Sequence, residues 1–237
     1  MKTIYLSVLF LLASLVSYAD GYWLELTGSG KVGDTVHIRI RYGGVDEQKN
    51  RYIKSGTDLD KMKGFELFSF DAAGHKKIIP IQQYDSSWAG YFIPSSDGQY
   101  TILAKNETLP VVERPDSLQN IKPVQYLCAS YNVGINSKQL APVQYLDIRV
   151  MLEKNTIIAH PFIQQQPVVK GTKLRIFYPD NHDEPVTVDN EGKAVVNVIT
   201  KGLYLVRLDW VDHTPGSYKG KKYYAIRHRC DYAVEVK

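Results

Sequence analysis

The chain has 237 residues and a formal net charge of +4, and 44% of its residues are hydrophobic. So mild a basic excess argues against a nucleic-acid-binding surface, which needs Lys and Arg clustered on one face. Tyr occurs 17 times and Phe only 7 times, and Tyr, Val, Ile and Thr are the residues typical of strands. Length and composition therefore favour a β-rich globular protein of one large or two small domains.

Residues 1–19 have the pattern of a secretory signal peptide. Lys2 precedes an apolar run over residues 4–16, and Ser17 and Ala19 place small side chains at the two positions that a signal peptidase reads. The run is shorter than the roughly 20 residues that span a bilayer, so no membrane anchor is expected. The sequence predicts a periplasmic or secreted protein whose mature chain begins at Asp20.

Alternating side chains then predict strands through most of the chain. Residues 22–26 form the first such run, and in residues 35–42 apolar side chains alternate with His37, Arg39 and Arg41, which are expected to face solvent. The alternation recurs at residues 172–178, 194–199 and 204–210, and clusters of Gly, Pro, Asp and Asn separate these runs. Only residues 58–63 and 116–120 are expected to hold a turn or two of helix.

A short sequence pattern that recurs in the two halves of the chain suggests how these strands are grouped. Gly-x-Tyr precedes a strand in each half, and Tyr100 and Tyr204 in these steps resemble the tyrosine corner of immunoglobulin-like sandwiches. We therefore predict an all-β protein with two immunoglobulin-like β-sandwich domains in tandem, over residues 20–113 and 145–237. Residues 114–144 would connect the domains and add a strand at residues 125–130.

Five short segments together resemble a known family. They are YWLEL at 22–26, VGDTV at 32–36, KGTKLRI at 170–176, VDNEGKA at 188–194 and AVEV at 233–236. They resemble a family of bacterial exported proteins of unknown function, described by similarity to the periplasmic component of cobalt and nickel uptake systems. The resemblance covers most of the mature chain. It implies a partner in the envelope, such as a transporter or an outer-membrane receptor.

The same resemblance implies a transition-metal ligand at the mature N-terminus. Members often begin with a His that can hold nickel or cobalt together with the terminal amine, and here Asp20 stands in that place. Asp is an oxygen ligand, harder than imidazole. Further candidate ligands are His160, His182, Asp183, His213 and His228. No two histidines have the spacing of a recognised metal motif, and each taken singly is more simply a loop or surface residue.

Cys128 and Cys230 are the only cysteines of the chain. In an exported protein such a pair predicts a disulfide, and two free thiols are the alternative. A disulfide here would close a loop of about 100 residues and stabilise the protein by about 4 to 5 kcal/mol in the chain-entropy model.

The sequence carries no Gly-x-Ser-x-Gly elbow, no phosphate-binding loop and no catalytic Cys motif, so no enzymatic activity is expected. Two function hypotheses remain. The first is a non-enzymatic binding or accessory protein of an envelope transport system, which binds a metal ion or metal complex. The second is a structural or recognition module that presents aromatic side chains to a glycan or an envelope protein. The aromatic candidates are Tyr131, Trp210, Tyr218, Tyr223 and Tyr224.

Overall fold

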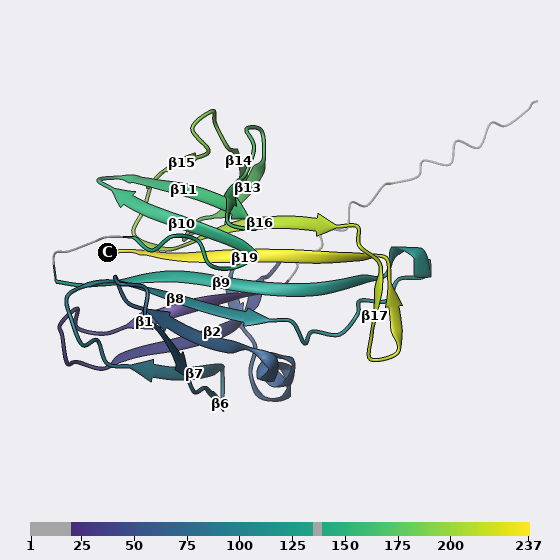
Figure 1. Ribbon diagram of the computed structural model, residues 1–237, viewed down its shortest axis with the longest axis horizontal. Coiled ribbons are helices and arrows are strands. Elements are labelled where there is room, and N and C mark those ends of the chain that lie inside the picture. Colours follow the sequence, from purple (N-terminus) through teal and green to yellow (C-terminus); the bar gives the residue numbers. More distant parts are fainter. Residues whose placement is uncertain (1–19, 135–138) are drawn as a thin grey trace, which may run out of the picture.

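The computed structural model describes residues 20–134 and 139–237 (Figure 1), and the predicted signal peptide lies outside the described residues. The described part is mostly β, as predicted. Its first half contains β1 (Gly21–Thr27), β2 (Val36–Val45), β3 (Arg51–Ile53), η1 (Gly56–Gly64), β4 (Glu66–Phe70), β5 (Lys76–Ile79), β6 (Gln82–Tyr84), β7 (Ser87–Phe92), β8 (Gly98–Asn106), η2 (Ser117–Gln119) and β9 (Ile121–Val133).

The second half continues with strands alone in the residues described. They are β10 (Leu146–Glu153), β11 (Thr156–Ile163), β12 (Gln166–Pro167), β13 (Lys173–Phe177), β14 (Asp183–Thr187), β15 (Ala194–Asn197), β16 (Gly202–Asp212), β17 (Gly216–Tyr218), β18 (Lys221–Tyr223) and β19 (Ala225–Val236). The two helical elements, η1 and η2, are short 3-10 turns that fall where turns of helix were predicted. Neither is a candidate to span a bilayer, and the search of the described residues finds no such helix.

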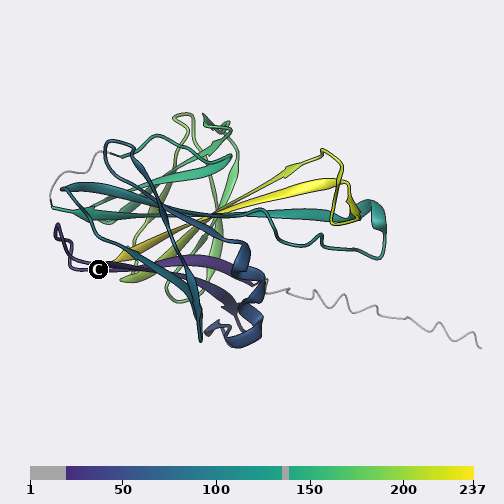
Figure 2. The same ribbon diagram turned by 60° about the horizontal axis from the view of Figure 1, so that its bottom comes forward.

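The strands form three stacked layers. A central sheet has eight strands in the order β14-β13-β16-β19-β9-β8-β4-β5. A five-stranded sheet of β1, β2, β3, β6 and β7 lies below the long central strands in Figure 1, and a four-stranded sheet of β10, β11, β12 and β15 lies above them. The β17–β18 hairpin forms an arm that projects from these layers, as Figure 2 shows.

Strand β9 sends its side chains to two different cores. Tyr126 and Cys128 pack with the four-stranded sheet, whereas Leu127 and Ala129 pack with the five-stranded sheet. A strand covered on both faces is buried almost continuously along its length, and β9 has this pattern. The segment predicted to connect two sandwiches therefore supplies a central strand, which pairs in parallel with β19. Because the central sheet takes strands from both halves, the domain boundaries at 113 and 145 stay predictions.

The predicted faces of β2 are confirmed. Val36, Ile38 and Ile40 are at most 1% exposed and belong to the core, whereas His37 and Arg39 are exposed. Arg41 lies on the same face as these two, but its side chain is only 14% exposed, contrary to the expectation. The parity of this strand thus directs a row of basic side chains away from the central sheet.

Two tyrosines form hydrogen bonds with the turns that precede strands β8 and β16 of the central sheet. The hydroxyl of Tyr100 donates to the carbonyl of Ser96 at 3.0 Å, and that of Tyr204 donates to the carbonyl of Thr200 at 2.8 Å. Each hydroxyl also accepts from two upstream backbone N–H groups. In a tyrosine corner the hydroxyl hydrogen-bonds to backbone groups a few residues upstream, and the two Gly-x-Tyr steps predicted this contact. It is present in both halves.

Candidate functional site

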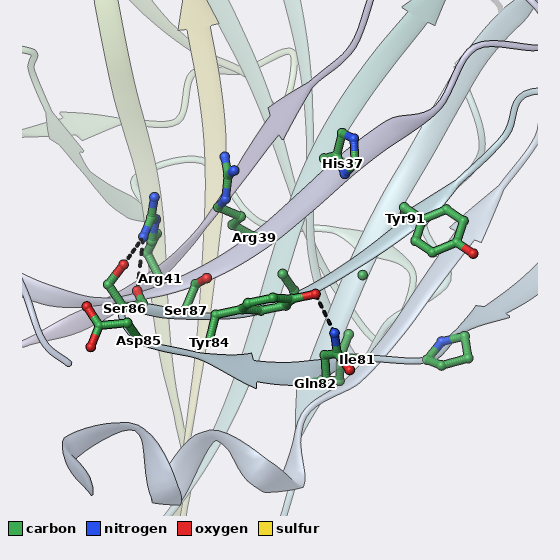
Figure 3. A pocket seen from close by; sticks show the side chains of 13 residues that line it. His37, Arg39, Arg41, Ile81, Gln82, Tyr84, Asp85, Ser86, Ser87 and Tyr91 are labelled. Atoms are coloured by element: carbon green, nitrogen blue, oxygen red, sulfur yellow. Dashed lines mark hydrogen bonds between the residues drawn. The ribbon is translucent and has the colours of Figure 1, made fainter. Parts of the chain in front are cut away.

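A groove of about 980 Å³ lies on the face of the five-stranded sheet that turns away from the central sheet (Figure 3). Strand β7 pairs with β2 on one side and with β6 on the other, so the three strands build it together. We name it the basic groove. Its lining residues are His37, Arg39, Arg41, Pro80, Ile81, Gln82, Tyr84, Asp85, Ser86, Ser87, Ala89, Gly90 and Tyr91.

Small side chains on β7 form the floor of the basic groove. Ala89 is the register partner of Arg39 on β2 and of Gln82 on β6, and its single methyl group leaves the space between them open. At Gly90, an added Cβ would lie 2.6 Å from the carbonyl oxygen of Pro80. Glycine is therefore needed where the chain passes from β5 to β6 beside β7.

Arg41 is held firmly at one end of the groove. Its Nε donates to Glu25 Oε2 at 2.8 Å, and its terminal nitrogen donates to the carbonyl and the Oγ of Ser86 at 3.0 and 2.8 Å (Figure 3). Glu25 comes from the neighbouring strand β1 and offsets part of the Arg41 charge. These contacts fix the guanidinium in place before any ligand arrives.

Arg39 and His37 differ from Arg41 because their side chains are uncommitted. Glu25 is the register partner of Arg39, yet its carboxylate bonds with Arg41 instead. Within residues 20–134 and 139–237, no hydrogen bond or ion pair engages the Arg39 or His37 side chain. An exposed, unpaired guanidinium presents a fork of donors that matches a carboxylate or a phosphate.

Two exposed tyrosines flank these basic side chains. Tyr91 is 63% exposed and is the register partner of His37, and Tyr84 is 53% exposed. The hydroxyl of Tyr84 accepts a hydrogen bond from the Gln82 side chain (Figure 3). Flat rings beside an unpaired guanidinium can bind a ligand that has both an apolar face and an anionic group.

Asp20, the predicted metal ligand, lies in a hydrogen-bonded cluster apart from the groove lining. It accepts from the hydroxyl of Tyr42 at 2.6 Å and from that of Tyr52, and Lys61 donates to Tyr42. Burial acts to raise the pKa of the Asp20 carboxyl, but the two tyrosine hydrogen bonds and nearby Lys54 and Lys61 outweigh it and lower the pKa. Its oxygens are therefore engaged as acceptors that tie β1 to β2 and β3.

The other predicted metal ligands lie on separate elements. They are His160 on β11, His182 and Asp183 at the start of β14, His213 just beyond β16, and His228 on β19. His182 stacks on Tyr178 with ring centroids 4.0 Å apart, and Asp183 pairs with Arg175 at 3.2 Å. In the part of the chain that the structure describes, no group of three or more His, Cys, Asp or Glu side chains could hold a metal ion.

Cys128 and Cys230 lie on the neighbouring strands β9 and β19. Both are buried as free thiols with their sulfurs 3.5 Å apart, and the side chain of Gln144 donates to Cys128 Sγ at 3.2 Å. Burial raises the pKa of the Cys230 thiol well above its usual range. The structure thus brings the two cysteines together, and the disulfide between them stays a prediction.

The aromatic residues singled out in the sequence have different environments. Trp210 and Tyr224 are 42% and 40% exposed. Tyr131 and Tyr218 instead bond to backbone groups, since Tyr131 accepts from the Gly30 N–H and Tyr218 donates to the Thr108 carbonyl. Tyr223 is partly buried on the arm.

Sequence reasoning placed His37, Arg39 and Arg41 on the right face but did not find the groove. The available signal was the run of basic side chains at alternate positions of β2. Tyr84 and Tyr91, which complete the site, come from strands β6 and β7 that the alternation did not single out. Their position depends on strand pairing, which a single sequence does not display.

Comparisons with known proteins add little to this geometry. No family model and no curated protein matches the chain. Among solved structures, a crystal structure of a tetra-tandem repeat in the extending region of a large adhesion protein is similar at 11% identity and a TM-score of 0.27. The match covers 92% of this chain and 50% of that one, so this chain spans about half the length of the adhesion-protein chain.

Proposed function

We propose that the protein is an exported, non-enzymatic recognition module that binds an acidic glycan in the basic groove. The observation that carries this proposal is the exposed and unpaired guanidinium of Arg39 between Arg41 and the exposed ring of Tyr91. In the same proposal, the two halves are immunoglobulin-like sandwiches that share the central sheet and present this face to the periplasm or to the outside of the cell.

A glycan that carries carboxylates fits both parts of the groove. The guanidinium of Arg39 can bind a carboxylate through two parallel N–H···O hydrogen bonds. The rings of Tyr84 and Tyr91 can stack on the apolar face of a sugar, which gives contact area at little cost in conformational entropy. Arg39 and Arg41 face one acidic residue in the lining, Asp85, and Glu25 just outside the lining pairs with Arg41, so the positive charge left for a ligand is that of Arg39.

Calorimetric titration with two matched ligands tests this proposal. Oligogalacturonate of defined length carries a carboxylate on each sugar, and its methyl ester has the same shape without the charge. We expect the acid to bind and the ester to bind at least about tenfold more weakly, since one charge-assisted contact contributes on the order of 1.5 kcal/mol.

The variant Arg39→Gln should reduce the affinity for the acid by about tenfold for the same reason. Lys170→Gln is the matched control, because it removes one exposed positive charge from the turn before β13, which is not part of the groove lining. Equal binding of acid and ester, or equal binding by wild type and Arg39→Gln, would refute a carboxylate site at Arg39.

The transport-accessory role remains a separate prediction, which rests on the family resemblance. Metal analysis of untagged protein tests it, with Asp20→Ala as the variant. One equivalent of nickel or cobalt that is lost in the variant would support that role. Protein without bound metal in both forms would count against it.

A further inference from the structure

The four-stranded sheet leaves part of the central sheet uncovered. Strand β10 packs on β19, β9 and β16, whereas β4 and β5 lie at the far edge of the central sheet. There Ile78 is 69% exposed beside its register partner Phe68. A second groove, of about 400 Å³, lies between this face and residues 143–145. We name it the aromatic groove, after its lining residues Phe68, Phe70, Tyr126 and Tyr145.

A buried histidine supports one wall of the aromatic groove. The imidazole of His228 stacks on Tyr145 with ring centroids 4.3 Å apart, and its Nδ1 lies 3.1 Å from the hydroxyl of Tyr126. His228 is only 6% exposed, and its Nε2 has no hydrogen-bond partner among the described residues. Strand register places Trp210, which is 42% exposed, beside His228 on the same face. A row of rings therefore extends from the groove toward the arm.

The aromatic groove has as many acidic as basic side chains in its lining, whereas the lining of the basic groove has one more Arg than acidic residues. Glu66 and Glu107 line it together with Lys76 and Lys105. Lys105 pairs with Glu107 at 3.2 Å, and the Lys76 ammonium lies 3.8 Å from the centre of the Phe68 ring. The groove thus offers donors, acceptors and flat apolar rings without an excess of either charge.

We propose that the aromatic groove is a second carbohydrate site, which binds a neutral oligosaccharide. Sugar hydroxyls both donate and accept hydrogen bonds, so they match neighbouring Lys and Glu side chains, while the apolar face of the sugar stacks on an aromatic ring. Tyr145 is the main stacking platform. The aromatic groove lies on the face of the central sheet opposite to the five-stranded sheet, so this site and the acidic-glycan site can be tested separately.

Titration calorimetry with cellohexaose, maltohexaose and mannohexaose, each tested against the full chain, examines this proposal. We expect at least one of the three to bind. Tyr145→Ala should weaken that binding about tenfold because it removes the stacking ring, and Tyr145→Phe should retain most of it. Phe68→Ala on the opposite wall provides a second variant that does not depend on the 143–145 segment.

Tyr91→Ala and Arg39→Gln are the matched controls, because both residues belong to the basic groove. They should leave binding of the neutral hexasaccharide unchanged, and far-ultraviolet circular dichroism verifies that each variant is folded. The proposal is overturned if none of the three hexasaccharides binds, or if binding survives both Tyr145→Ala and Phe68→Ala unchanged. Loss of neutral-sugar binding in Tyr91→Ala or in Arg39→Gln would also overturn it, since the sugar would then occupy the basic groove.

Discussion

At the scale of single residues, the burial of His228 makes the stability of the folded chain depend on pH. Its side chain is buried between two tyrosines, and desolvation lowers the pKa of its imidazole below the usual 6.5, although Asp212 and Glu107 act in the opposite direction. The unfolded chain takes up a proton as the pH falls through about 6.5, while the folded chain resists protonation to a lower pH. The contribution of His228 to the free energy of unfolding is therefore fully present above pH 6.5, and it is lost as the pH falls toward the pKa of the imidazole in the folded chain.

The variant His228→Phe should flatten this pH dependence. We expect the urea midpoint of the wild type to drop between pH 7 and pH 5 by more than that of the variant, because the variant has no imidazole to protonate on unfolding. His213→Gln, at an exposed position beyond β16, should behave as the wild type does. An identical drop in wild type and His228→Phe would show that this buried imidazole does not set the acid sensitivity.

Cys128 and Cys230 are buried on adjacent strands, with their sulfurs 3.5 Å apart. Protein secreted into an oxidising compartment should contain the Cys128–Cys230 disulfide, so that unfolding without reductant exposes no titratable thiol. Reduction should then lower the free energy of unfolding by up to about 4 to 5 kcal/mol. Two cysteines per chain that an alkylating reagent modifies in protein denatured at lysis, before any reductant is added, would contradict the disulfide.

At the scale of elements, the tyrosine corners fix where strands β8 and β16 begin. Tyr204 is fully buried, and its hydroxyl satisfies one carbonyl and two N–H groups of the preceding turn. Tyr204→Phe leaves these backbone groups without their partner, which costs about 1 to 3 kcal/mol in the free energy of unfolding. Chemical denaturation measures this loss. Tyr91→Phe is the control at an exposed ring, and an equal effect of the two substitutions would argue against the corner.

The elements also show what a single sequence reveals. The Gly-x-Tyr steps and the alternation in β2 are local patterns, and both predicted the observed burial and hydrogen bonds. The parallel pairing of β9 with β19 joins residues about a hundred positions apart, for example Tyr126 with Cys230. Nothing in the local pattern of either strand specifies that partner, so β9 was expected in a connecting segment. The basic groove was missed for the same reason, because Arg39 meets Ala89 and Gln82 only through strand pairing.

At the scale of the whole molecule, the shared central sheet couples the two halves. Leu127 belongs to one core and its neighbour Cys128 to the other, so melting β9 disrupts both. We expect a single cooperative unfolding transition, with circular dichroism and the fluorescence of Trp23, Trp88 and Trp210 changing at the same denaturant concentration. Two separated transitions would indicate that the halves are stable independently of each other.

The proposal that this fold presents a basic groove to acidic glycans is tested most directly by mapping a bound ligand. Nuclear magnetic resonance of isotope-labelled protein, titrated with oligogalacturonate, reports which backbone amides respond. Shifts should concentrate in β2, β6 and β7, with Arg39, Ala89 and Tyr91 among the largest. No response, or a response confined to other strands or to the β17–β18 arm, would contradict the proposal.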